Sequence, residues 1–196
     1  MHGTLMPGPL TTRSSLAGAA AKFDLDFKGK VVLDAGSSTG GFTDYALRHG
    51  AKKVIAVDSG TQQLHPSLRN NPKVEIHENT DIRGFKPESA PDIVLVDVSF
   101  ISLRGVLPHI AGISDDKTVI VAMLKPQFEV YAEHGRGTGK EALNKGVVKN
   151  DKLRRQIMRD FELWSRKLFI IVDKADSGVA GAHGNVERFY QLTLRG

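Results

Sequence analysis

Short runs rich in β-branched residues alternate along this chain with amphipathic helical patterns. The clearest helical stripe, Leu153, Ile157, Phe161 and Trp164, follows a capping residue at Asn150 or Asp151. Alternation of this kind is typical of a largely parallel sheet that helices cover on both faces. The runs that predict strands are residues 30–34, 53–58, 74–77, 92–98, 118–124, 168–173 and 188–194. The sequence therefore predicts an α/β fold with a seven-stranded, mostly parallel, doubly wound sheet of the Rossmann-like type.

The composition limits the number of domains and the kinds of site. A chain of 196 residues with 40% hydrophobic residues suits one domain. We expect residues 1–12, rich in Gly and Pro, to form a flexible tail before a domain at 13–196. The chain has no cysteine, which excludes disulfides and thiolate metal sites and favours a reducing cytoplasm. No apolar run is long enough to cross a bilayer, so we expect no membrane insertion. We also expect no metal site.

A glycine-rich turn joins the first predicted strand to a helix. The strand ends at Asp34 and runs into Ala-Gly-Ser-Ser-Thr-Gly-Gly, residues 35–41. A turn of this kind places backbone N–H groups and a helix N-terminus beside whatever binds there. Gly36 and Gly40 would let a ligand approach the backbone. Their spacing departs from the dinucleotide fingerprint, which makes a nicotinamide dehydrogenase the least favoured function.

Acidic residues also follow the next two predicted strands. Asp58 ends residues 53–58, where a carboxylate can accept hydrogen bonds from a ribose diol. The strand at 74–77 leads to Glu-Asn-Thr-Asp at 78–81, where Asp81 could meet an adenine amino group. Because ligands of such sheets lie at the carboxyl ends of the strands, Asp34, Asp58 and Asp81 together predict a nucleoside-containing cofactor.

Several segments resemble, in order, a known family of RNA-modifying enzymes. The segments are VVLDAGSSTGGFTDYALRHGA, IAVDSGTQQL, IVLVDVSFISL, LKPQFE and GNVERF. They are similar to the TlyA family, haemolysin-named and FtsJ-like ribosomal RNA 2′-O-methyltransferases, over about residues 13–194. The resemblance implies a class I methyltransferase fold, S-adenosylmethionine as methyl donor and a ribose hydroxyl of ribosomal RNA as acceptor. The implied cofactor residues are Asp34, Gly36, Ser37, Ser38, Thr39, Gly40, Asp58, Asp81 and Asp97.

The resemblance also implies a catalytic set. FtsJ-like enzymes use a Lys-Asp-Lys-Glu tetrad, and three of its members match Asp97, Lys125 and Glu187, each at the end of a predicted strand. A lysine amine is a useful base only when burial or a neighbouring cation lowers its pKa. On this hypothesis Asp97 and Glu187 orient Lys125 and the acceptor hydroxyl.

The chain departs from the family pattern at two points. Ser15 stands where family spacing places the first tetrad lysine, and the nearest lysine, Lys22, lies about 10 Å further along a helix. Family members also carry a small RNA-binding domain before the methyltransferase, and this chain has no room for one. We therefore expect either a fragment or a short form, with activity reduced or lost without the first lysine.

Positive charge is concentrated in one segment. The chain has a net charge of +5 and an isoelectric point near 9.5. Residues 136–155 hold seven basic and two acidic side chains. A solvated loop and helix face would look the same, but an RNA-binding surface is our hypothesis. Two further alternatives are a degenerate member that binds RNA and S-adenosylmethionine without turnover, and a small-molecule methyltransferase. The sequence does not indicate an oligomeric state.

Overall fold

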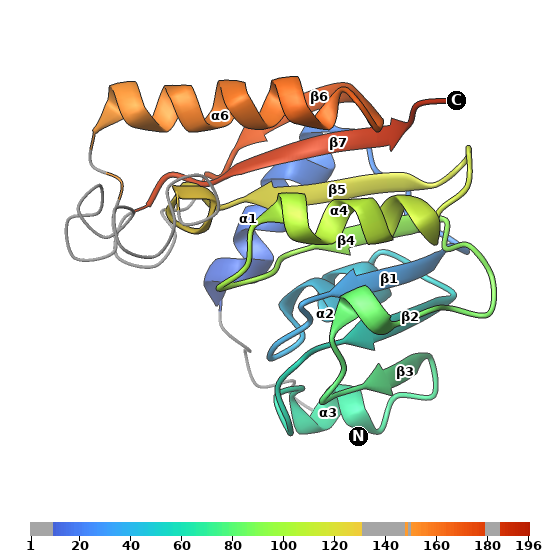
Figure 1. The fold of residues 1–196 in the computed structure, drawn as a ribbon. Helices are drawn as coiled ribbons and strands as arrows, with labels where there is room; N and C mark the ends of the chain where they lie inside the picture. The colour runs from blue at the N-terminus through green and yellow to red at the C-terminus, as the bar shows by residue number, and fades with distance from the viewer. Residues whose placement is uncertain (1–9, 131–147, 149, 179–184) are drawn as a thin grey trace.

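One seven-stranded sheet forms the centre of the molecule (Figure 1). The computed structural model describes residues 10–130, 148, 150–178 and 185–196. The strand order is β3-β2-β1-β4-β5-β7-β6, with β1 to β5 parallel and β7 antiparallel to both β5 and β6. The strands are β1 (Val31–Ala35), β2 (Lys53–Val57), β3 (Val74–His77), β4 (Ile93–Val96), β5 (Val119–Leu124), β6 (Phe169–Asp176) and β7 (Arg188–Leu194). The predicted α/β fold with a seven-stranded, mostly parallel sheet is confirmed.

Helices cover both faces of this sheet. They are α1 (Leu10–Lys22), α2 (Gly41–Arg48), α3 (Pro66–Arg69), α4 (Leu103–Gly112) and α6 (Asp151–Ser165), with a 3-10 helix η1 (Ile82–Gly84). Residues 126–130, directly after β5, are also helical. Helix α6 begins at the predicted cap, since the Asn150 side chain accepts hydrogen bonds from the backbone N–H groups of Lys152 and Leu153.

Successive strand residues enter different apolar cores because side chains alternate across a sheet. Leu33 packs in the core that α4 and α6 cover, together with Leu107 and Phe161. Val32 packs in the core that α1 and α2 cover, together with Leu16 and Phe42. The helices lie on the two faces accordingly, so the sheet is doubly wound as predicted.

The structure differs from the sequence-based bounds mainly at the start of helix α1 and at the end of strand β6. Helix α1 begins at Leu10, so residues 10–12, assigned above to the tail, are helical, while 1–9 lie outside the described residues. The buried Leu16 and Ala20 fix α1 against the sheet, and the helix extends from there toward its N-terminus. Strand β6 continues to Asp176 rather than stopping at 173, because an edge strand tolerates polar residues on its solvent side.

The chain reverses its direction across the sheet between β1 and β4. From β1 it proceeds through β2 to β3 on one side, and from β4 through β5 on the other, while β1 and β4 are hydrogen-bonded neighbours. A crevice forms at the carboxyl edge where strand order reverses in this way, and ligands of open α/β sheets bind there. The loops that follow β1, β2 and β4 are therefore the place to search for a site.

Candidate active site

The glycine-rich turn after β1 forms the floor of the site. Gly36 has a φ of 87° and Gly40 a φ of 94°, values that favour glycine. A Cβ on Gly36 would overlap the backbone carbonyl of Asp97, and one on Gly40 would overlap the side chains of Leu64 and Leu68. Close packing against backbone thus requires glycine at 36, and the left-handed φ favours glycine at 40, whereas the sequence suggested ligand approach for both.

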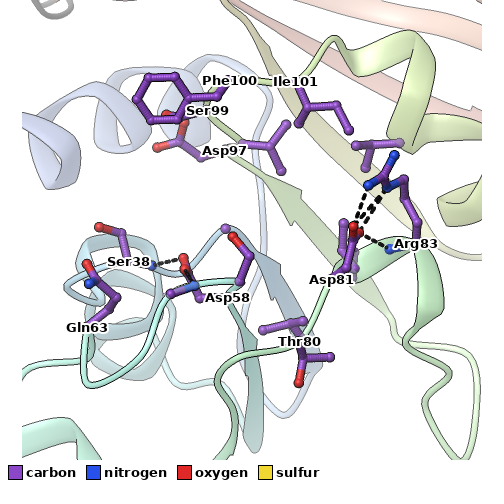
Figure 2. Close-up of a pocket in the computed structure, with 17 residues that line it drawn as sticks. Ser38, Asp58, Gln63, Thr80, Asp81, Arg83, Asp97, Ser99, Phe100 and Ile101 are labelled. Carbon is purple, nitrogen blue, oxygen red and sulfur yellow. Dashed lines mark hydrogen bonds and ion pairs between the residues drawn. The ribbon is translucent and has the colours of Figure 1, made fainter.

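A cavity of about 490 Å³ opens beside this turn (Figure 2). That volume falls in the range of small-molecule and cofactor pockets. Its walls come from the ends of β1, β2, β3 and β4 and include Gly36, Ser38, Asp58, Asp81 and Asp97. The structure therefore brings together residues from the ends of four strands that are far apart in the sequence, from Gly36 to Asp97.

Four of the predicted cofactor residues do not line the cavity. Ser37 and Asp34 are buried, and Gly40 precedes α2 as its N-terminal cap. The Thr39 carbonyl accepts a hydrogen bond from the His65 backbone N–H and so supports the neighbouring loop. These residues shape the turn from beneath, where a sequence pattern alone does not separate support from contact.

Asp34 is a fully buried carboxylate under the turn. Its Oδ2 accepts a hydrogen bond of 2.6 Å from the Thr43 hydroxyl of α2. Burial raises the pKa of Asp34 to about 7, the Thr43 hydrogen bond opposes this, and the nearby carboxylates of Asp97 and Asp58 add to it. Burial therefore favours the protonated form of Asp34 far more than in an exposed aspartate.

Asp58, directly after β2, faces the cavity with its carboxylate held in place. Oδ2 accepts a hydrogen bond of 2.8 Å from the Ser38 backbone N–H, and Oδ1 accepts one of 2.7 Å from Gly60 (Figure 2). Each carboxylate oxygen can accept more than one hydrogen bond. The fixed carboxylate therefore keeps acceptor capacity directed at the cavity.

The two acidic residues that follow β3, Glu78 and Asp81, have different roles. Asp81 lines the cavity, caps η1 and pairs with Arg83, which holds the pKa of Asp81 at about 2 (Figure 2). Glu78 accepts hydrogen bonds from the backbone N–H groups of Gln62, Gln63 and Leu64 and pairs with Arg69. Glu78 thus anchors the loop after β2, and Asp81 stands at the cavity wall with its charge already paired.

Asp97 lines the cavity, and Lys125 and Glu187 lie close to Asp97 without lining the cavity themselves. The Lys125 Nζ lies 2.5 Å from Asp97 Oδ1 and 3.1 Å from the Ser99 hydroxyl. Glu187 lies within electrostatic reach of both, and its Oε1 is 3.5 Å from the Gln127 side-chain nitrogen. These three residues lie at the ends of β4, β5 and β7, whose pairing brings them to one edge of the sheet.

Burial dominates the electrostatics of the two acids. It raises the pKa of Asp97, while the Lys125 ammonium beside it opposes the rise. Burial also raises the pKa of Glu187, with Lys125 lowering it and Asp97 raising it. The three groups therefore form a coupled, largely dry cluster of two acids and one amine.

The N-terminal helix does not add a second lysine through Lys22. Ser15, which stands at the expected lysine position, is buried in α1. Lys22 pairs with Asp173 at 3.3 Å and donates to the Lys174 carbonyl, both on the edge strand β6. Lys22 is thus held two strands away from β5 and its Lys125.

Sequence reasoning missed several residues that complete the site. Ser99 and Phe100 follow Asp97 and line the cavity, and Phe100 is 91% exposed with a φ of 65°. Its ring lies 5.3 Å from that of Phe128, near Gln127 in the helical residues after Lys125. A bulky residue with positive φ is uncommon and clusters at functional sites. The available signal was the pair of motifs DVSFIS and KPQFE, each directly after a strand.

The strand order and the polar strand ends define an α/β protein of the methyltransferase type. A family model described as FtsJ-like methyltransferase matches residues 14–193, and the chain belongs to this family. It is 42% identical over 167 residues to the 23S rRNA (cytidine-2′-O)-methyltransferase TlyA of Campylobacter jejuni, covering 85% of this chain and 63% of that protein. It is 40% identical over 181 residues to the 16S/23S rRNA (cytidine-2′-O)-methyltransferase TlyA of Mycobacterium tuberculosis, covering 90% and 65%.

Solved structures agree with this membership. A hemolysin-named protein from Streptococcus thermophilus superposes with a TM-score of 0.86 at 34% identity, covering 98% of this chain and 69% of that one. The chain spans slightly less than two thirds of the two rRNA methyltransferases named above. Within the described residues, no helix is both long and apolar enough to span a membrane.

Proposed function

We propose that this protein transfers a methyl group from S-adenosylmethionine to a ribose 2′-hydroxyl of ribosomal RNA. The observation that carries the proposal is the cluster of Asp97, Lys125 and Glu187, of which Asp97 lines the cavity. Lys125 Nζ lies 2.5 Å from Asp97, and the two acids are largely buried. A positioned amine can accept the proton of a weakly acidic hydroxyl once a neighbouring cation, such as the sulfonium of a bound cofactor, offsets the two carboxylates. Both TlyA relatives are named as enzymes of this chemistry.

The cavity fits S-adenosylmethionine. Asp58 can receive the ribose diol, the turn at Gly36 and Ser38 can lie along the nucleoside, and Asp97 closes the far end. The volume of about 490 Å³ suits a ligand of that size. The bound cofactor supplies an electrophilic methyl group on a positively charged sulfur.

The chain's own residues would act on the acceptor hydroxyl. Lys125 accepts its proton, which requires the neutral amine. A nearby cation favours the neutral form of an amine and nearby anions disfavour it. Asp97 and Ser99 fix the Lys125 amine from one side, at 2.5 and 3.1 Å. Glu187, anchored near Gln127, orients the hydroxyl from the other.

A methyl-transfer assay tests the proposal. The protein is incubated with ribosomal RNA and S-adenosylmethionine labelled in its methyl group, and the RNA is then hydrolysed with alkali. A 2′-O-methyl group blocks cleavage at its own nucleotide, so label should appear in alkali-resistant dinucleotides. Label in bases, or only in small molecules, would contradict a ribose acceptor.

Asp58→Ala should weaken S-adenosylmethionine binding by about 1–3 kcal/mol, the usual loss for charge-assisted hydrogen bonds. Isothermal titration calorimetry measures this directly. Asp92→Ala is the matched control, because Asp92 accepts a hydrogen bond from the Val31 backbone N–H at the opposite edge of the sheet. Equal affinities for the Asp58→Ala and wild-type proteins would refute the ribose assignment.

We propose that RNA contacts the segment 136–155 and that this contact continues along the basic face of α6 as far as Arg159. Residues 136–147 and 149 lie outside the described residues. Within α6, Lys152, Arg155 and Arg159 are exposed at a spacing that places them on one face. These three charges belong to helix α6, which begins at Asp151 within the segment 136–155. An exposed row of this kind suits phosphate contacts.

Replacing Lys152, Arg155 and Arg159 with glutamine should weaken RNA binding and flatten its salt dependence. Each lost phosphate contact lowers the log–log salt slope by about 0.7–0.9. Binding is measured by fluorescence anisotropy from low to high salt. The control replaces the exposed Lys28, Lys52 and Lys73, which removes the same charge elsewhere. If both triple variants reduce the slope equally, net charge rather than the α6 face attracts RNA.

A second candidate is a member that binds RNA and S-adenosylmethionine with little turnover. Ser15 favours it, because a buried serine occupies the place of the family's first lysine and Lys22 pairs with Asp173 instead. The assay above separates the two candidates by rate. This candidate shares the cofactor cavity, so both candidates predict S-adenosylmethionine binding.

A ribosomal RNA substrate and a sequence without cysteine are consistent with a cytoplasmic location.

A further inference from the structure

Glu129 is a buried carboxylate that the proposed mechanism does not use. It lies in the helical residues 126–130 that follow Lys125, and it is 1% exposed. One oxygen accepts a hydrogen bond of 2.6 Å from the Ser102 hydroxyl, and the other accepts one of 2.7 Å from the Leu103 backbone N–H. Burying a carboxylate is costly unless it is paired and hydrogen-bonded, so this arrangement requires a reason.

The Glu129 carboxylate accepts a hydrogen bond from a backbone N–H group in the first turn of α4. The leading N–H groups of a helix have no partner within the helix, and its N-terminus favours a negative charge. Ser102 is the N-terminal cap of α4 and accepts from the Arg104 backbone N–H. The Arg104 Nε lies 3.9 Å from Glu129, and its guanidinium lies over the Trp164 ring of α6. Glu129 is thus a cap supplied to α4 by a different segment.

This cap joins the two segments that carry the proposed catalytic pair. The acceptor loop, residues 97–102, follows β4, and the lysine segment, residues 125–129, follows β5. They meet at three successive places. Lys125 contacts Asp97 and Ser99, the ring of Phe128 lies 5.3 Å from that of Phe100, and Glu129 binds Ser102 and Leu103. Of these links, only the last is made by fully buried groups.

We propose that Glu129 is a positioning residue that holds Lys125 and Asp97 in register by tying the lysine segment to the acceptor loop. The expected effect of Glu129 on the methylation rate rests on the proposed function. Its expected effect on the position of Lys125 relative to Asp97 rests on the geometry alone. A displacement of about 1 Å at a reacting group can lower a rate a hundredfold, so the link matters even though Glu129 lies away from the cavity.

The test compares Glu129→Gln with Thr118→Val. Glutamine keeps the shape of Glu129 but removes the charge and turns an amide N–H₂ toward a donor. Thr118 is a matched control because it is also buried, and its hydroxyl donates to the Pro91 carbonyl. That hydrogen bond ties together the loops before β4 and β5, at the opposite edge of the sheet. Ser102→Ala is a second, milder variant that removes one donor to Glu129 together with the Ser102 cap of α4 and leaves the Glu129 charge in place.

Two measurements separate positioning from simple stability. In the protein without cofactor, carbon NMR of the Asp97 carboxyl gives its pKa. Burial raises that pKa and Lys125 opposes the rise, so a displaced amine should raise it further in Glu129→Gln. The acids near Asp97, namely Asp34 and Glu187, are the same in all variants. In the methylation assay, kcat should fall about ten- to a hundredfold in Glu129→Gln, with an unchanged KM for S-adenosylmethionine.

We expect Thr118→Val to lower the melting temperature without moving either readout, and Ser102→Ala to move both in the direction of Glu129→Gln. An Asp97 pKa that is unchanged in Glu129→Gln and Ser102→Ala, or shifted equally in Thr118→Val, overturns the positioning role whatever the activity. If the wild-type protein binds S-adenosylmethionine but methylates no RNA, while the pKa shifts only in the Glu129 and Ser102 variants, the proposed function fails and the positioning role holds.

Discussion

Replacing Lys125 with arginine should lower the single-turnover rate of ribose methylation by about 10²–10⁴-fold, the usual contribution of a positioned proton-transfer group. Arginine keeps the positive charge beside Asp97, so the buried acid retains a cation. Its guanidinium stays protonated in proteins and cannot accept the proton of the hydroxyl. Affinity for S-adenosylmethionine should change little, because Lys125 does not line the cavity. Rapid-quench kinetics with saturating cofactor measure the rate.

The control for this substitution lies at the other end of the same strand. Lys117, exposed just before β5, can be changed to arginine without touching the site. The Lys117→Arg rate should equal that of the wild-type protein. A Lys125→Arg protein that keeps more than about a tenth of the wild-type rate would exclude Lys125 as the proton acceptor, given the usual contribution of such a group.

Asp34→Asn should stabilise the protein relative to wild type increasingly as the pH rises from about 4 to about 7. Asp34 has an ordinary pKa of 3.8, and burial raises it to about 7 in the folded protein. Between these values the folded state keeps a proton that the unfolded state has lost. Wild-type stability therefore falls with rising pH over this window. At about 1.4 kcal/mol per pKa unit, the loss is on the order of 4 kcal/mol.

Urea unfolding of both proteins at several pH values measures this difference. Below about pH 4 the two proteins should be similar, because Asp34 is then neutral in both states, as asparagine is. Above about pH 7 the advantage of Asp34→Asn should be constant. Asp92→Asn, at an exposed carboxylate on the opposite edge of the sheet, is the control for removal of one aspartate charge. A difference between Asp34→Asn and wild type that is constant from pH 4 to 8 would contradict the raised pKa.

The sequence predicted the sheet well because strand signals are local. Buried parallel strands such as Val119–Leu124 form nearly continuous apolar runs, and their bounds were predicted within one residue, except that β4 ends at Val96, two residues before the predicted end. The short α3 and η1 were not predicted, since four residues or fewer carry no helical periodicity. The strand order also required the structure, because the place of β7 between β5 and β6 depends on pairing between distant residues.

The site was predictable only in outline. The strand-end acids Asp58 and Asp97 were found because their positions follow from the strands themselves. Glu129 and Ser99 were missed, since their importance comes from contacts with residues 26 or 27 positions away. Asp34 was expected to contact the cofactor, whereas it lies buried beneath the turn. A motif shows which residue types occur together, but burial separates those that support a site from those that touch a ligand.

The placement of β7 also sets an order of assembly. Strand β6 is synthesised before β7, yet within the described part of the chain β6 pairs with β7 alone, and β7 lies between β6 and β5. During synthesis β6 therefore has no partner strand until residues 188–194 have emerged. Glu187 arrives with β7, directly before its first residue. Completion of the sheet thus coincides with completion of the proposed catalytic cluster of Asp97, Lys125 and Glu187.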